Sequence, residues 1–290
     1  MTPTHAFDID EAISKLQQEL GPAPDDALCE AIRCADEDAV RRSKSHSLGL
    51  SSLRAKKSAI EARRPDFLRL LLEADSSVEE DLVFTACNRK DRQSTRMLID
   101  FGWPANQPVY FAASLLCIRV DDADFTEWLV KLGAEVGAQS KTGETALSFA
   151  IVRGSREVVR YLIAQGAETT HGDLLHCAAL RQNAMEGAEL VEDLVRKGAN
   201  VNAFRFDNPV AMQRRAMFKQ PTPLHVACEN GNALVAEVLI RHGANPRLKM
   251  LEAHEFTGPT PLDIARENGD RGLIALLSSE SMPEIPMDKL

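Results

Sequence analysis

Six cysteines and seven histidines are the residues of this 290-residue chain most able to bind a metal or to act in catalysis. A structural zinc site needs closely spaced Cys pairs with further ligands nearby. Cys29 and Cys34 have no second Cys pair and no His close enough to complete such a site. The sequence therefore predicts no metal and no cofactor, and reduced thiols are typical of a cytoplasmic or nuclear protein.

The sequence also lacks the residue groups that catalysis requires. His254-Glu255 resembles the start of a metalloprotease helix, but no second His follows at the four-residue spacing that zinc binding needs. Neither a Gly-x-Gly phosphate loop nor a Gly-x-Ser-x-Gly nucleophile turn is present. The acid pairs Asp25-Asp26 and Asp121-Asp122 lie in predicted turns or helix starts, where carboxylates are favoured. We predict that the protein is not an enzyme.

Charge and hydropathy narrow the classes of partner. The formal net charge is −9, which disfavours nucleic acid as a ligand. Residues 1–40 carry a net charge of −8, whereas residues 41–69 carry +7. This basic stretch is open to three interpretations: a nuclear import signal, a contact for a phosphoprotein or nucleic acid, or a solvated helix face. Ser and Leu interrupt its cations, which favours the solvated face.

Nothing in the sequence indicates a membrane protein. No apolar run approaches the ~18–20 residues that cross a bilayer. Asp8, Asp10, Glu11 and Glu19 stand where a signal peptide would have a basic start and an apolar centre. With 44% apolar and only 5% aromatic residues, a core must be built from Leu, Val, Ile and Ala. We therefore expect a globular chain with no membrane partner.

The elements that position these residues repeat along the chain. Thr145-Ala-Leu-Ser-Phe-Ala150 precedes Gly166-Ala167, and Thr222-Pro-Leu-His-Val-Ala227 precedes Gly243-Ala-Asn245, with 21 residues from Thr to Gly in both cases. Thr260-Pro-Leu-Asp-Ile-Ala265 begins a last copy. Successive Gly positions from Gly102 onward are 31, 33, 32 and 45 residues apart. The unit is therefore about 33 residues long, with local insertions.

Each copy predicts two short helices and a hairpin. Thr222-Pro223 opens the first helix, because Pro needs no N–H donor at the first helical position. Leu224, Ala227 and Cys228 give this helix one buried stripe. The second helix spans residues 233–241, with Leu234, Val238 and Leu239 on its inner side, and ends at Gly243. Such a unit cannot bury its apolar faces alone and must stack on its neighbours.

These motifs resemble those of the ankyrin-repeat family. Thr222-Pro-Leu-His225 with Gly243-Ala-Asn245 is nearly the full family pattern, and the copies starting at Thr145, Leu175 and Thr260 match in part. The resemblance implies an all-α solenoid of stacked helix–turn–helix units joined by hairpins. It also implies that Cys87 and Cys228 fill a small buried slot, and that His176 and His225 bond the adjoining hairpin.

We count about eight repeats over residues 25–280, degenerate over 25–139 and clearer over 140–280. An amphipathic N-terminal helix and linker are expected in 1–24, and a flexible tail in 281–290. The upstream repeats are placed at 25–46, 51–77, 80–106 and 107–139.

The hairpins differ in length along the chain. Gly133 to Thr145 is 12 residues, the normal family spacing, whereas the hairpin after Gly198 has 12 extra residues and that after Gly243 has 5 extra. After Gly102 and Gly166 the hairpins are shortened, and longer helix–helix turns are expected near 118–122 and 181–187. The two long hairpins belong to adjacent repeats, so we expect their insertions to form one continuous lip.

The longer insertion mixes cations with Phe and Met, residue types that carry interface energy and adapt to a partner. A solvated loop whose apolar residues fold back on the last hairpin is the alternative, and it is the more usual behaviour of long loops. Trp103, in a shortened hairpin, is either an exposed platform or a space-filling core residue, and its size favours the core. The residues expected to contact a partner are Arg205, Phe206, Arg214, Arg215, Met217, Phe218, His254, Phe256, Trp103 and Tyr110.

The family resemblance implies a non-enzymatic protein–protein interaction module. We expect it to be monomeric on its own, and its reduced thiols favour the cytoplasm or nucleus. The resemblance also implies a partner bound on the concave face and the late hairpins, without identifying that partner. Two alternatives remain. One is an atypical enzyme, or an enzyme subunit, with a pocket between the 205–220 and 250–258 loops. The other is a regulatory protein that contacts phosphoprotein or nucleic acid through 41–69.

Overall fold

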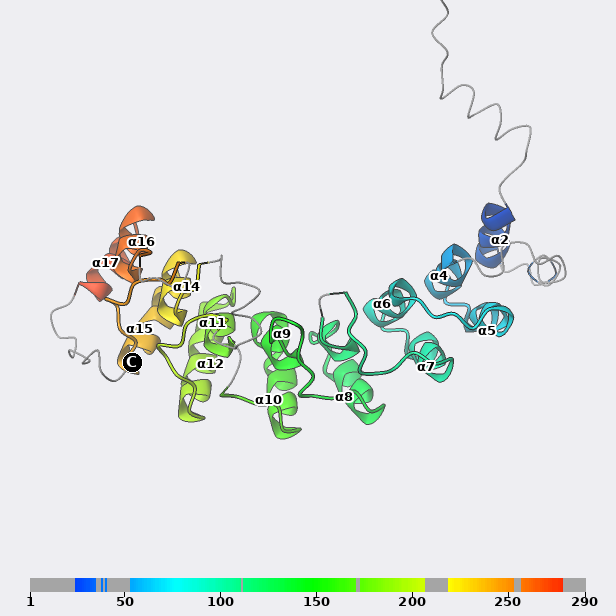
Figure 1. The fold of residues 1–290 in the computed structure, drawn as a ribbon, viewed down its shortest axis with the longest axis horizontal. Helices are drawn as coiled ribbons and strands as arrows, with labels where there is room; N and C mark the ends of the chain where they lie inside the picture. Colours follow the sequence, from blue (N-terminus) through cyan, green and yellow to red (C-terminus); the bar gives the residue numbers. More distant parts are fainter. Residues whose placement is uncertain are drawn as a thin grey trace, which may run out of the picture. The chain divides into compact units, whose positions relative to one another are not determined.

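The protein is seen here in a computed structural model, in which two compact units, Met1–Pro104 and Ala105–Leu290, can be distinguished. The predicted N-terminal helix and C-terminal tail lie outside the described residues. The residues that the structure describes are 24–34, 38, 40, 53–110, 112–170, 173–206, 219–252 and 257–278. Within these ranges all extended regular structure is helical, which confirms the predicted all-α repeat fold (Figure 1).

The first unit contains helix pairs that pack side by side along the chain. Helix α4 lies between α2 and α6, while α5 and α7 pack against each other in a second row (Figure 1). The predicted two-helix repeats at 51–77 and 80–106 are therefore confirmed, whereas the second half of the 25–46 repeat lies mostly outside the described residues. The helices are α2 (Pro24–Arg33), α4 (Leu53–Glu61), α5 (Pro65–Ala74), α6 (Glu80–Asn88) and α7 (Arg92–Asp100).

The second unit contains five further repeats arranged in the same way. The first helices stack in one row, η1 on α9, α11, α14 and α16, and the second helices form another row beside it (Figure 1). The elements are η1 (Leu115–Cys117), α8 (Ala123–Lys131), α9 (Ala146–Arg153), α10 (Arg156–Ala164), α11 (Leu174–Ala179), α12 (Ala184–Arg196), α14 (Pro223–Glu229), α15 (Ala233–Arg241), α16 (Pro261–Glu267) and α17 (Arg271–Leu277).

Local sequence explains where the helices begin and end. Thr260 accepts a hydrogen bond from the Asp263 N–H at 3.2 Å, and the Asp263 carboxylate accepts one from the Thr260 N–H at 3.0 Å, which closes a capping box at the start of α16. Gly243, just beyond α15, has φ of 90°, a left-handed conformation that strains other residues. The predicted bounds of α15 are thus reproduced residue for residue.

The core of the clearest repeat follows the predicted stripe with one exception. Leu224, Ala227 and Cys228 are completely buried in α14, between α11 and α16. In α15 the inner side is formed by Val235, Ala236, Val238 and Leu239. Leu234 was predicted to face inward but is only half-buried, and the buried position belongs to the next residue, Val235. Val235 takes the inner position because α12 packs on that side of α15.

The first helix of the 107–139 repeat is reduced to a single 3₁₀ turn. Val109 and Ala112 exchange two backbone hydrogen bonds of 3.1 and 2.9 Å around Tyr110, whose φ is 54°. A left-handed residue cannot lie within a right-handed helix, so helical structure starts only at Leu115. The expectation of two full helices in this repeat is therefore wrong for its first half.

The predicted longer turn at 181–187 is also wrong. Asn183 caps α12 by accepting a hydrogen bond from the Glu186 N–H, and the helix begins at Ala184. The additional residues therefore extend α12 to 13 residues instead of forming a loop. Arg181 occupies the short turn and is buried there.

The described part of the basic stretch is largely paired with acids of its own unit. Lys56 is 1% exposed, and its ammonium lies 2.9 Å from Asp75 and 2.8 Å from the Ser77 carbonyl oxygen. Lys57 pairs with Asp81, and Arg64 with Asp66. The expected solvated face is thus wrong for Lys56, because the Asp75 carboxylate compensates its burial. The hydrogen bond from the Ser77 hydroxyl, followed by that from Lys56, holds the pKa of Asp75 well below its usual range, at about 2.

Candidate protein-binding surface

The bases of the two late hairpins are joined to each other. The Gln220 N–H donates to the Leu251 carbonyl at 2.8 Å, and the Leu251 N–H donates back to the Gln220 carbonyl at 3.2 Å. Beside this bridge, Lys219 lies 3.3 Å from Glu252. The insertions themselves, residues 207–218 and 253–256, lie outside the described residues. Their attachment points are therefore side by side, as expected for adjacent repeats.

Arg205 and Phe206 anchor the start of the longer insertion. The Arg205 N–H donates to the Pro221 carbonyl at 2.9 Å, so the two ends of this hairpin meet. The Phe206 N–H donates to the Asp173 carboxylate at 3.0 Å, and the Arg205 guanidinium lies 4.9 Å from the Phe206 ring centre. Phe206 is only 6% exposed, so its expected role as an exposed contact is wrong. Its ring packs inward because the chain turns there, at φ of 64°.

The Asp173 carboxylate contacts both residues at the start of the longer insertion, Arg205 and Phe206. Burial raises the pKa of this carboxyl, while the Phe206 N–H and the charge of Arg205 oppose that increase. Burial likewise raises the pKa of the neighbouring Cys177 thiol to about 12. The thiol therefore stays protonated at neutral pH and is a poor nucleophile.

Two buried histidines tie successive hairpins to the first helices. His176 Nε2 lies 3.0 Å from the Pro221 carbonyl, and His225 Nε2 lies 3.1 Å from the Pro259 carbonyl. A carbonyl only accepts, so Nε2 carries the proton in both rings. The Thr222 N–H donates to His225 Nδ1 at 3.1 Å, which requires that nitrogen to be unprotonated. The structural role expected for both histidines is confirmed, and both rings are neutral.

These neutral histidines predict a loss of stability in mild acid. Burial lowers the pKa of His176 to about 3 and that of His225 to about 4. Unfolding returns both to about 6.5, so between these values the unfolded chain binds more protons and stability rises with pH. As the pH falls below about 6.5, each ring should lower the free energy of unfolding by about 1.4 kcal/mol per pH unit, until the pH reaches the pKa of that ring in the folded protein. Urea unfolding at pH 7, 6 and 5 should show this decrease.

His176→Gln separates this effect from a general acid sensitivity. The variant retains His225 alone of the two rings, so the dependence of its unfolding free energy on pH should be about half as steep. We expect the variant to be less stable at pH 7 whether or not His176 is neutral in the fold. The informative quantity is therefore the slope of the unfolding free energy against pH. Equal slopes for the variant and the natural protein would show that His176 is not held neutral by the fold.

The two aromatic residues singled out in the earlier repeats have opposite environments. Trp103 is 6% exposed and packs in the core of the first unit, so its expected role as an exposed platform is wrong and its role as a core residue is confirmed. Tyr110 is 52% exposed, at the tip of the tight turn in the second unit. Tyr110 thus remains accessible to a partner.

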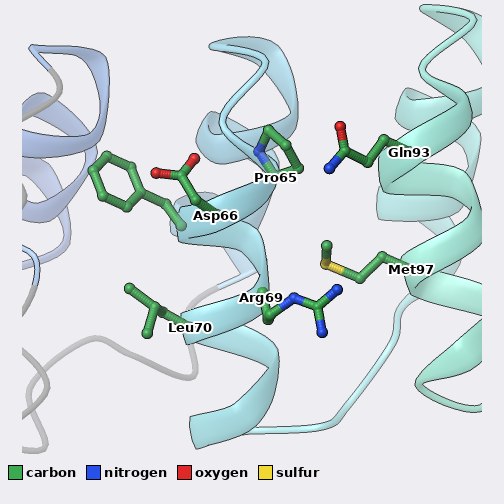
Figure 2. Close-up of a pocket in the computed structure, with 7 residues that line it drawn as sticks. Pro65, Asp66, Arg69, Leu70, Gln93 and Met97 are labelled. Carbon is green, nitrogen blue, oxygen red and sulfur yellow. The ribbon is translucent and has the colours of Figure 1, made fainter.

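Two cavities lie between second helices of successive repeats, away from every residue expected to contact a partner. One, of about 480 Å³, lies between α5 and α7, where Arg69 and Met97 point into the gap (Figure 2). The other, of about 300 Å³, lies between α10 and α12. Sequence reasoning missed both because it searched the hairpin edge.

Comparison with known proteins identifies the family. The family model "Ankyrin repeats (3 copies)" matches residues 110–205 and 175–286. The chain belongs to the ankyrin-repeat family. The family match covers η1 through α17, the helix pairs that also make up the second unit.

Several curated proteins are similar to this ankyrin-repeat chain. Ankyrin repeat and KH domain-containing protein mask-1 of Caenorhabditis elegans is 28% identical over 221 aligned positions, and the match covers 58% of this chain and 8% of the relative. Ankyrin repeat and SOCS box protein 16 of Homo sapiens is 33% identical over 166 residues, 55% of this chain and 35% of the relative. The mitochondrial disaggregase of Bos taurus is 33% identical over 135 residues, 47% of this chain and 19% of the relative. The chain thus spans 8% to 35% of these relatives.

The described residues of this ankyrin-repeat chain offer little reactive chemistry. Within those ranges no three His, Cys, Asp or Glu side chains gather as a metal site would require. No described helix combines the length and apolar character needed to cross a bilayer. Cys34 is exposed, while Cys87 and Cys228 are fully buried in the predicted small slots. Burial raises the pKa of both of these buried thiols to about 12.

Proposed function

We propose that this ankyrin-repeat protein is a non-enzymatic adaptor, scaffold or inhibitor that binds a protein partner through its concave face and its late hairpins. The joining of the two long hairpins at Gln220 and Leu251 carries this proposal. The described ends of the two hairpins meet in this hydrogen-bonded base, and a preformed base lowers the entropic cost of binding a partner there. The protein acts as a monomer in the cytoplasm or nucleus.

The residue types at this surface suit a protein partner. Arg205 is one-third exposed and fixed by Asp173, so its guanidinium is oriented before a partner arrives. Arg214, Arg215, Met217 and Phe218 follow in the same insertion, and His254 and Phe256 belong to the neighbouring one. Arg and aromatic side chains are the usual anchors of protein interfaces. Tyr110 offers a further aromatic contact in an earlier repeat.

The described chemistry of the late hairpins disfavours the enzyme alternative. His176 and Cys177 are adjacent in sequence, yet the His176 ring is bonded to a backbone carbonyl and the Cys177 thiol is held protonated by burial. Neither is available as a base or nucleophile. The alternative based on the basic stretch is disfavoured because Lys56, Lys57 and Arg64 are paired within their own unit.

Removal of residues 208–219 tests the proposed function. The tagged protein is used to isolate its principal partner from the native source, with mass spectrometry to identify it, and the affinities of full-length and shortened chains are then measured by calorimetry. The deletion should leave the circular dichroism spectrum and melting temperature nearly unchanged, because loop closure entropy depends weakly on length. Affinity should fall at least about tenfold, or roughly 1.4 kcal/mol.

A matched control changes a different surface of the same chain. Lys131→Glu with Arg271→Glu alters two exposed cations on second helices, away from the hairpins, and should bind the partner as the natural protein does. Equal affinity of the shortened and full-length chains would overturn the assignment of the late hairpins. A copurifying small molecule in place of a stoichiometric protein would support the enzyme alternative.

A further inference from the structure

The cavity between α10 and α12 is a groove formed by two matching helix faces. Its lining residues are spaced i, i+3, i+4 and i+7 on both helices, so two turns of each face the gap. Residues that follow two turns on each helix suit an extended or helical segment as the occupant. The lining residues are Arg156, Val159, Arg160, Ile163 and Ala164 of α10, with Leu190, Asp193 and Leu194 of α12 and Lys197, the residue that follows α12.

The gap exists because α12 lies against the following repeat. At Gly187 a Cβ atom would meet the Ala178 carbonyl oxygen at 2.8 Å and a methyl group of Val235 at 3.2 Å. The absence of a side chain therefore allows α12 to approach α11 and α15 closely. Glu192 strengthens this contact by pairing with Arg241 and His242 of the α15 side, each at 2.8 Å. Helix α12 packs closely on α15 but only sparsely on α10.

The floor of the groove is apolar and its rim is basic. Val159, Leu190 and Leu194 form the floor, with exposed fractions of 3%, 4% and 1%. Two ionised rim residues are already neutralised: Arg156 pairs with Glu189, and Asp193 pairs with Arg196 at 2.8 Å. Arg160 and Lys197 are exposed and have no ion-pair partner among the residues that the structure describes. The groove therefore carries two uncompensated positive charges in a chain whose net charge is −9.

We propose that this groove binds an acidic amphipathic segment of a partner protein, with its apolar side chains on the floor and its carboxylates on Arg160 and Lys197. A cavity of about 300 Å³ is at the small end of ligand sites, too small for most cofactors. Since a dry cavity of ~150 Å³ accommodates a benzene ring, this groove has room for one or two large apolar side chains. Helix-in-groove recognition uses the same i, i+3, i+4 and i+7 spacing that the groove presents.

The charge pattern distinguishes this groove from the larger cavity of the first unit. There the ionised lining residues are Arg69 and Asp66, which are of opposite sign (Figure 2). Of these two cavities, the α10–α12 groove is the one that combines an apolar floor with an excess of positive charge. It involves second helices, whereas the late hairpins border the first helices, so the two surfaces can be occupied independently.

A peptide selection tests this proposal on the full chain. The probe is a phage library of random twelve-residue peptides, selected on the immobilised protein and depleted on Ala164→Phe, whose larger side chain fills the groove. Surviving peptides should carry a Leu, Ile, Met, Phe or Trp flanked by Asp or Glu. Synthetic versions, measured by fluorescence polarisation, should bind at least tenfold more weakly to the double variant Arg160→Glu with Lys197→Glu.

The double variant Lys141→Glu with Arg271→Glu is the matched control, because it makes the same change in net charge at exposed cations outside the groove. It should bind the peptides as the natural protein does, and removal of 208–219 should have no effect. The proposal is overturned if no peptides survive depletion, if the survivors are basic, or if reversal of the rim charges matches the control. A dimer that becomes monomeric in Ala164→Phe would assign the groove to a second copy of the chain and would equally overturn it.

Discussion

Replacement of Leu224 by Asp should abolish cooperative folding of the repeats around α14. Leu224 is completely buried between α11 and α16, so a carboxylate there loses its hydration and finds no partner. Loss of a buried Leu alone costs about 2–5 kcal/mol, and the buried charge adds to this. The total is at least about 5 kcal/mol, comparable with the whole stability of a typical domain. Thermal unfolding followed by circular dichroism should show a melting temperature lower by at least ~10 °C and reduced helicity.

The last repeat provides a matched control for this substitution. Leu262 occupies the same position in the Thr-Pro-Leu motif of α16, but it is only half-buried because no described helix stacks beyond that repeat. Leu262→Asp should therefore lower the melting temperature by much less than Leu224→Asp. If the two variants melted alike, burial between repeats would not be the source of the effect. A Leu224→Asp protein with the same melting temperature as the natural protein would contradict the repeat register itself.

The fold was predictable because its determinants are local and repeated. Thr222-Pro223 and Gly243 specify helix ends through backbone chemistry that acts within a few residues. The prediction was wrong where one residue departs from its local preference. Tyr110 adopts a left-handed conformation that sequence propensity disfavours, and it shortens the first helix of its repeat to a 3₁₀ turn. Such a residue is held by contacts that only the folded chain makes.

The candidate sites were less predictable, because they depend on burial. Phe206 and Trp103 are of residue types that often anchor protein interfaces, but both side chains are buried. Conversely, the spacing of Arg156, Arg160 and Ile163 on α10 is visible in the sequence, yet an apolar helix face is ordinarily a packed face. The open face accompanies the close packing of α12 on α15, which Gly187 permits.

Replacement of Arg181 by Ala should be the most destabilising truncation of a charged residue in the second unit. The guanidinium donates to the Ile151 carbonyl at 2.6 Å and to the Gly154 carbonyl at 2.8 Å. A residue of the next repeat thus supplies hydrogen-bond donors to the carbonyl groups at the C-terminal end of α9. It also pairs with Glu186 in the first turn of α12, with Nε 2.8 Å from the carboxylate. Truncation leaves these buried acceptors without a donor, at a cost of about 3–5 kcal/mol. Urea unfolding monitored by circular dichroism gives this difference directly.

Two further variants separate the hydrogen bonds of Arg181 from its packing. Arg196→Ala removes an exposed arginine paired with Asp193 and should cost less than about 1 kcal/mol, because surface pairs are weak. Arg181→Met retains an apolar stem of similar length but donates no hydrogen bond. It should be nearly as unstable as Arg181→Ala if the carbonyl bonds carry the stability. An Arg181→Met protein as stable as the natural one would show that the side chain contributes only by filling space, since Arg stems can stabilise by packing alone.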